Sequence, residues 1–269
     1  MKVKVFLYLL LPVLLLATAC DLEKEIEVAL PEHTPQLVVE CYLQQGKTFK
    51  MTVTESASYF DAPQSLFVPN AEVYITHNGR RIKLNYKPMV AKQAGKYYTH
   101  TSTEVMNAKP GDIFGLEVTD NKGRKVTGFT TILPVVPIEE VEWKFNEKEK
   151  AYLLTSFQDN ASTTNYYRYV THVDSLNTRP ERDFTLDDDL TNGKRTTLGS
   201  AYDYDRNDTI IVSLYHIEKQ YYDFLNSVDD AKSANGNPFA QPSKIKSSVQ
   251  GGIGIFTNLA FERKTVVLN

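Results

Sequence analysis

The sequence predicts a mainly β protein, in which an immunoglobulin-like β-sandwich is followed by a second β-rich domain with one amphipathic helix. Short segments of alternating apolar and polar residues recur along the chain, with turn-forming residues between them. Beyond the first twenty residues, a single stretch has a clear helical period. The 16 Tyr and 13 Phe against one Trp are an aromatic load that favours strands.

The first domain is expected over residues 36–133. Its predicted strands are 37–43, 49–54, 71–76, 81–86, 96–100, 113–119 and 124–132. Cys41 lies on the apolar face of the first strand, so we expect it to pack as a small hydrophobic side chain. Asn78-Gly79 has the sequence of a two-residue hairpin turn with positive φ angles. Short strands with turns between them are typical of an immunoglobulin-like sandwich.

The second domain is expected over residues 138–269, after a short linker that Pro134 and Pro137 stiffen. Its predicted strands are 141–145, 151–157, 166–173, 209–215, 251–256 and 261–268. We expect residues 174–208 to be polar and irregular. Apolar residues at positions 221, 224, 225 and 228 then predict an amphipathic helix over 218–232.

The N-terminus is predicted to be a signal peptide, residues 1–19, followed by a lipidated Cys20. Two lysines precede an apolar run that is short for a membrane span, and small residues lead to the cysteine. This is a lipobox, although Ala17 stands where leucine is usual. Acyl chains on Cys20 would anchor the chain to a membrane, because each buried methylene contributes about 0.8 kcal/mol. The alternative is an ordinary signal peptide that happens to precede a cysteine.

Residues 20–35 are predicted to form a tether, in which Asp21–Glu27 is strongly acidic. The repulsion of like charges favours a solvated linker. The same run resembles the acidic export signal that sends Bacteroidota lipoproteins to the outer face of the outer membrane. We therefore expect an outer-membrane, lipid-anchored protein at the cell surface, with the plain linker as the alternative.

Charge and cysteine usage restrict the possible partners. Without Lys2 and Lys4 of the signal peptide, 28 basic residues stand against 33 acidic ones, a net charge of −5. Such a balance argues against a nucleic-acid partner. Once Cys20 is acylated, Cys41 is the one remaining cysteine, so no intramolecular disulfide can form.

The sequence contains no recognisable catalytic or cofactor motif. The five histidines lack metal-ligand spacing, and no HExxH, GxSxG or GxGxxG pattern occurs. We therefore assign no catalytic residues, no cofactor and no metal site. A weak calcium candidate is Asp203, Asp205 and Asp208, whose alternating oxygens would suit the ion. The glycine and glutamate of an EF-hand loop are missing there, so a polar turn is the other interpretation.

Three motifs resemble a Bacteroidota lipoprotein family catalogued as domain of unknown function 4249. They are 236–242 with 251–256, residues 159–167, and residues 188–194. The family has no established activity, so the resemblance transfers no catalytic residues. It implies a lipoprotein with an immunoglobulin-like first domain and a β-rich second one, often encoded beside TonB-dependent outer-membrane receptors.

These observations favour a non-enzymatic accessory lipoprotein, which holds or delivers a ligand for a TonB-dependent receptor in nutrient uptake. Loops 56–69, 187–192 and 235–242 are the expected contact surfaces. One alternative is a surface hydrolase acting on a polymer, with acidic residues from the 187–208 region, which Asp188→Ala and Asp203→Ala would test. Another is a structural or adhesive surface protein.

Overall fold

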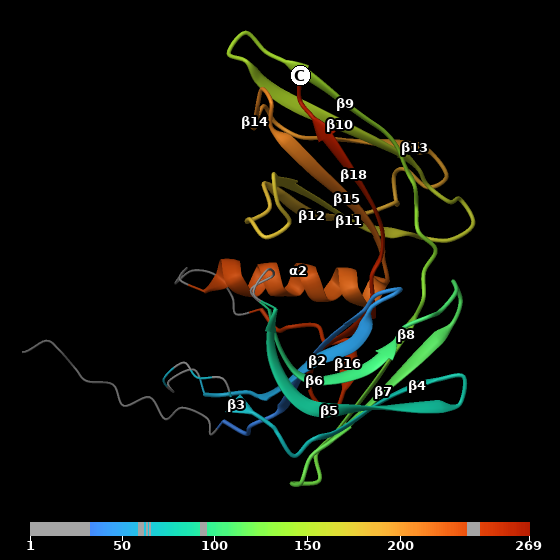
Figure 1. Cartoon of the computed structure of the whole chain (residues 1–269), viewed down its shortest axis with the longest axis vertical. Helices are drawn as coiled ribbons and strands as arrows, with labels where there is room; N and C mark the ends of the chain where they lie inside the picture. Colours follow the sequence, from blue (N-terminus) through green and yellow to red (C-terminus); the bar gives the residue numbers. More distant parts are fainter. Residues whose placement is uncertain (1–32, 59–61, 63, 65, 92–95, 236–242) are drawn as a thin grey trace, which may run out of the picture. The chain divides into compact units, whose positions relative to one another are not determined.

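The computed structural model describes residues 33–58, 62, 64, 66–91, 96–235 and 243–269. In this part of the chain the protein is mainly β with one helix, α2, which confirms the predicted fold class (Figure 1). Residues Pro35–Asn269 form one compact unit. The signal peptide 1–19, Cys20 and most of the 20–35 tether lie outside the described residues. Among the helices described, none is long and apolar enough to cross a membrane.

One large sheet contains ten strands, in the order β16-β8-β7-β4-β5-β6-β2-β1-β17 with β3 beside β2. Most of these strands come from the first half of the chain, and their positions agree with the sequence prediction. Their bounds are β1 Leu37–Leu43, β2 Thr48–Glu55, β3 Leu66–Phe67, β4 Glu72–His77, β5 Arg80–Ala91, β6 Lys96–Val105, β7 Ile113–Thr119, β8 Lys125–Thr131, β16 Val249–Gln250 and β17 Ile253–Asn258.

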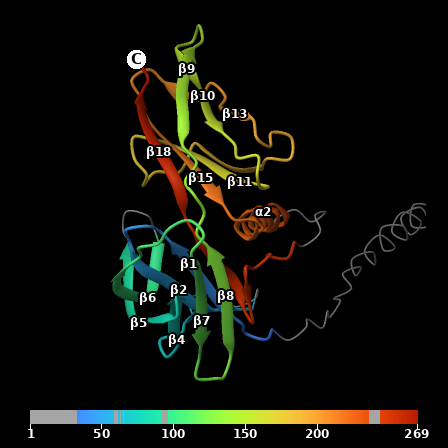
Figure 2. The same cartoon turned by 90° about the vertical axis from the view of Figure 1, so that its right-hand side faces the viewer.

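The end of the chain nearly closes this sheet. β16 pairs antiparallel with β8, and β17, two residues later, pairs parallel with β1. Figure 2 shows the red C-terminal part of the chain passing beside β8. Residues 251–256 are predicted to belong to the second domain, and their pairing with β1 corrects this. Val249 and Phe256 are buried in the hydrophobic core of the first sheet. An alternating pattern reveals a strand but not its neighbour, which is why the sequence could not place this one.

Gly254 makes the close pairing of β17 with β1 possible. Its φ is +132°, and an added Cβ would lie 1.8 Å from the carbonyl oxygen of Val39. Only glycine fits a position where backbone approaches backbone this closely.

The second half of the chain forms two smaller sheets, each of four strands. One contains β9 Ile138–Phe145, β10 Lys150–Gln158, β13 Arg195–Gly199 and β14 Tyr204–Asp205, and the other contains β11 Tyr166–Val173, β12 Arg182–Asp187, β15 Thr209–Ile217 and β18 Ala260–Val267. The expectation that 174–208 is irregular was therefore wrong, because β12, β13 and β14 lie within it. These strands are short and carry few apolar residues, so they leave little periodicity in the sequence.

Each half has its own hydrophobic core, and helix α2, Lys219–Ala234, contacts β11, β12 and β17 (Figure 1). The helix matches the predicted 218–232 closely, and Tyr221 of its apolar stripe is buried. The packing of Cys41 is also confirmed, since the side chain is fully buried and burial raises the pKa of its thiol to about 12.

Candidate functional site

Two turns of the second half meet over a set of buried polar side chains. The first turn, residues 159–165, joins β10 to β11, and the second, residues 188–194, joins β12 to β13. The register of β11 against β12 pairs Tyr166 with Asp187, so the residues next to them, Asn165 and Asp188, come together at the ends of the two strands. We call Asp159, Asn165 and Asp188, with Tyr167 and His216, the anchoring network.

Asn165 is the centre of the anchoring network. Its backbone N–H donates to the Asp188 carboxylate at 2.8 Å. Its side-chain amide faces oxygens of both carboxylates at 3.2 Å and the backbone carbonyls of Asn160 and Thr163 at 2.8 and 2.7 Å. One buried amide therefore fixes the backbone of the first turn and links it to the second.

Asp159 holds the second turn from the other side. Its carboxylate accepts a hydrogen bond from the Tyr167 hydroxyl and one from the backbone N–H of Gly193, the latter at 2.7 Å. Burial, together with the Asp159 carboxylate, raises the pKa of Tyr167, which therefore remains a donor. Gly193 has a φ of +70° and an added Cβ would lie 2.6 Å from Ala161, so the two turns touch at this point.

His216, near the end of β15, closes the network. Its Nδ1 lies 2.8 Å from the Pro134 carbonyl oxygen, and its Nε2 lies 3.2 Å from Asn165 Oδ1. Burial lowers the pKa of His216, while the Pro134 carbonyl and the charges of Asp159 and Asp188 act in the opposite direction. The ring thus lies between the 133–138 segment and the first turn.

A cavity of about 510 Å³ lies beside the network. Apolar groups form most of its wall, and Thr163, Asn165 and His216 border it. Glu218, on another side, is the N-cap residue of α2 and accepts hydrogen bonds from five donors on β8, β17 and α2. A negative charge at a helix N-terminus is favourable, so this carboxylate joins α2 to the first sheet.

Leu190 is the most exposed of the large apolar side chains in the described chain, at 88 % exposure. It stands in the second turn, between Asp188, whose carboxylate accepts the Asn165 backbone N–H, and Gly193, whose backbone N–H donates to Asp159. The arrangement presents an apolar side chain to solvent on a turn with little freedom to move.

The acidic residues singled out from the sequence have other partners here. Asp203 pairs with Arg182, Asp205 pairs with Lys150, and the Asp208 carboxylate accepts the backbone N–H of Asp205 at 2.7 Å. Asp188 is buried in the anchoring network. Throughout the described ranges, no three His, Cys, Asp or Glu side chains lie close enough together to hold a metal ion.

The expected contact loops are described only in part. Most of 187–192 is a turn of the anchoring network, whereas residues 59–61, 63 and 65 of the 56–69 loop and residues 236–242 lie outside the described residues. His216 and Glu218 were not singled out, and their spacing in the sequence carries no signal for the roles they play.

A family model described as "Domain of unknown function (DUF4249)" matches residues 23–265. The chain belongs to this family. The anchoring network of this DUF4249 protein brings together two of the motifs that carried the resemblance, 159–167 and 188–194, and the glycine motif 251–256 nearly closes the first sheet.

Other comparisons add little about function. A search of curated proteins found no match. Among solved structures, the chain is similar to one described as "Cytokine receptor complex - Crystal form 1A", at 12% identity over 68% of this chain and 86% of that chain, with a TM-score of 0.28.

Proposed function

We propose that this protein is a surface-exposed outer-membrane lipoprotein that acts, without catalysis of its own, as a binding partner of a TonB-dependent receptor in nutrient uptake. The observation that carries the proposal is the exposed Leu190 on a turn fixed by buried carboxylates. The lipobox at Cys20, the acidic tether and the genetic neighbourhood implied by the family resemblance support its location.

A single exposed leucine is ordinary on a protein surface, so its setting is what matters. Binding costs free energy for every loop that must become ordered, and a turn that is already fixed avoids much of that cost. The network holds the turn 188–194 at two separate points, through the Asp188 carboxylate, which accepts the Asn165 backbone N–H, and through the Gly193 backbone N–H, which donates to Asp159. We infer that the turn inserts Leu190 into an apolar pocket of the partner.

Tethering supports the same role. A folded body on a flexible lead at the membrane has a high effective concentration toward a neighbouring membrane protein, so a small interface suffices. The cavity of about 510 Å³ beside the network is within the size range of small-ligand sites, which suits a protein that passes a ligand to a receptor.

The test is affinity purification of the tagged full-length lipoprotein from mild detergent, followed by mass spectrometry. We expect a TonB-dependent barrel in near-equal amount, and we expect Leu190→Asp to reduce its recovery at least tenfold. Leu176→Asp is the matched control, because Leu176 is also exposed, at 41 %, but lies outside both turns of the network. Its recovery of the barrel should equal that of the wild type.

Two results would overturn the proposal. One is recovery of the lipoprotein alone under all growth conditions that express it. The other is turnover of a glycan or peptide by the purified protein that is lost in Asp203→Ala, which would favour the hydrolase.

A further inference from the structure

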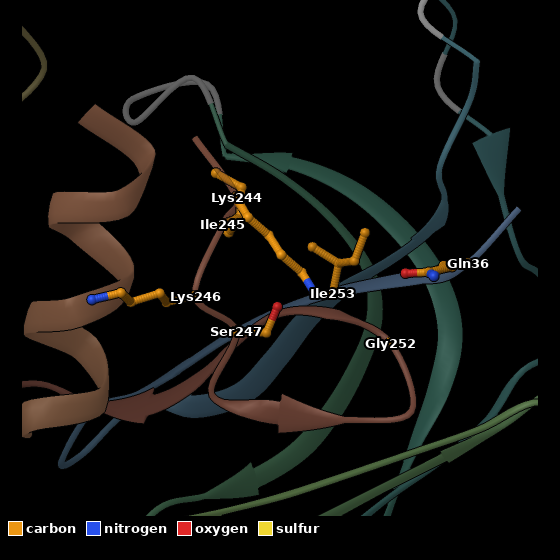
Figure 3. A pocket seen from close by; sticks show the side chains of 7 residues that line it. All are labelled: Gln36, Lys244, Ile245, Lys246, Ser247, Gly252 and Ile253. Atoms are coloured by element: carbon orange, nitrogen blue, oxygen red, sulfur yellow. The ribbon is translucent and has the colours of Figure 1, made fainter. Parts of the chain in front are cut away.

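A hollow of about 630 Å³ lies beside the start of β1, away from the anchoring network. Residues 244–247, the β16–β17 turn and Gln36 surround it (Figure 3). Among the described residues that line it, Lys244 and Lys246 are basic and none is acidic. The described part of the lining therefore carries a positive charge.

Three side chains that carry hydrogen-bond donors border this hollow. Figure 3 shows the Lys244 side chain reaching across the hollow toward Ile253, and the Ser247 hydroxyl pointing into the same space. Ser247 Oγ accepts the backbone N–H of Gly254 at 3.1 Å, so the hydroxyl hydrogen remains available to donate. The Gln36 side chain lies on the opposite side with its amide oxygen nearer the hollow (Figure 3), and a flip of the amide turns its NH2 group toward a bound anion.

The three donors are an ammonium, a hydroxyl and an amide, which together suit an oxyanion. Ile245 and Ile253 also line the hollow and supply apolar surface beside the donors. A ligand that satisfies both parts has an anionic head and an apolar body. A hollow of this size accommodates such a small molecule.

We propose that this hollow binds small amphiphilic carboxylates, with the carboxylate at Lys244, Ser247 and Gln36 and the apolar body against Ile245 and Ile253. The biological meaning of the site, as a second place where a small ligand is held besides the cavity at the anchoring network, rests on the proposed function. The binding itself is a property of this chain alone, so it is tested without the receptor.

The experiment is calorimetric titration of the purified full-length protein with octanoate at neutral pH. We expect saturable binding of one octanoate per chain. Octan-1-ol should bind at least tenfold more weakly, because it lacks the charge, and acetate should do the same, because it lacks the apolar body. Inorganic phosphate tests the alternative anion and should also bind more weakly than octanoate.

Two matched variants locate the site. Lys244→Met keeps most of the aliphatic side chain and removes the ammonium, and it should weaken octanoate binding about tenfold or more, as expected for a charged hydrogen bond. Lys246→Met removes the same charge two residues away, from a side chain that points toward α2 in Figure 3, and should weaken binding much less than Lys244→Met does.

The inference is overturned if octanoate does not bind, if Lys246→Met weakens binding as much as Lys244→Met, or if octan-1-ol or phosphate binds as tightly as octanoate. If the lipoprotein recovers a receptor but does not bind octanoate, this site is rejected and the proposed function stands. If it binds octanoate but recovers no receptor, the site stands and the proposed function is rejected.

Discussion

Replacing Gly254 by alanine should destabilise the protein severely, because this glycine lies where β17 meets β1. Alanine at a φ of +132° costs about 1–3 kcal/mol in backbone strain. The added Cβ would also lie 1.8 Å from the Val39 oxygen and 3.0 Å from the Val39 nitrogen. These are main-chain atoms, so no rotation of a side chain can relieve the overlap.

β17 must therefore move away from β1, and the backbone hydrogen bonds around the Val39–Gly254 pair are lost. Two such bonds are worth about 2 kcal/mol in net terms. With the backbone strain, the total loss is about 3–5 kcal/mol, a large part of the roughly 5–15 kcal/mol that stabilises a typical domain.

The assay is urea unfolding followed by circular dichroism, and the matched control is Gly115→Ala. Gly115 also lies in a strand of the first sheet, but its added Cβ would meet only Thr76, at 3.9 Å. Alanine there should be neutral or stabilise the protein by a few tenths of a kcal/mol up to about 1 kcal/mol. The closing role of β17 is refuted if the free energy of unfolding of Gly254→Ala lies within about 0.5 kcal/mol of the wild-type value. It is also refuted if Gly254→Ala and Gly115→Ala lose equal stability.

Three further predictions concern buried side chains. Asn165→Ala leaves two carboxylates without their shared donor and should lower the free energy of unfolding by about 2–4 kcal/mol. Limited proteolysis should then cut the variant at 160–164 and 188–194. Asn177→Ala, at an exposed position, is the control and should change neither result. Burial lowers the pKa of His100 to about 4. The neutral ring therefore contributes about 3 kcal/mol to the free energy of unfolding above pH 6.5, and this contribution is lost as the pH falls toward 4. His100→Phe should remove this pH dependence from a plot of unfolding free energy against pH. Cys41 should resist a thiol reagent in the folded protein and react in urea, and rapid labelling without denaturant would contradict its packing.

The sequence allowed the local structure to be predicted well where one face of an element is buried. β1 alternates strictly, the stripe around Tyr221 has a helical period, and Asn78 and Gly79 adopt φ angles of +49° and +76° as their turn requires. The short strands in 174–208 were missed because their side chains are mostly polar and half-exposed, so no apolar period marks them.

Long-range pairing was beyond what the pattern could predict. Phe256 of β17 lies opposite Cys41 of β1, although Cys41 stands more than two hundred residues earlier in the chain. Nothing in the sequence of either strand specifies the other as its partner. The anchoring network could be predicted only in part from the sequence. The resemblance drew attention to 159–167 and 188–194, but their meeting depends on the register of β11 against β12, which the sequence does not reveal.

Strand β17, which nearly closes the first sheet, stabilises both proposed binding surfaces. β17 completes the first sheet, and after Leu259 the chain continues as β18 in the sheet of β11 and β15. Ile253 of β17 borders the basic hollow, and His216 of β15 belongs to the anchoring network. Binding groups are placed most precisely when they stand on strands and on turns that buried contacts fix. Loosening of β17 should therefore weaken octanoate binding at the hollow before it affects receptor recovery through Leu190. Phe256→Leu, a milder change than Gly254→Ala, should lower the unfolding midpoint and weaken octanoate binding while receptor recovery is still normal. If octanoate binding and receptor recovery are lost together, this order is refuted.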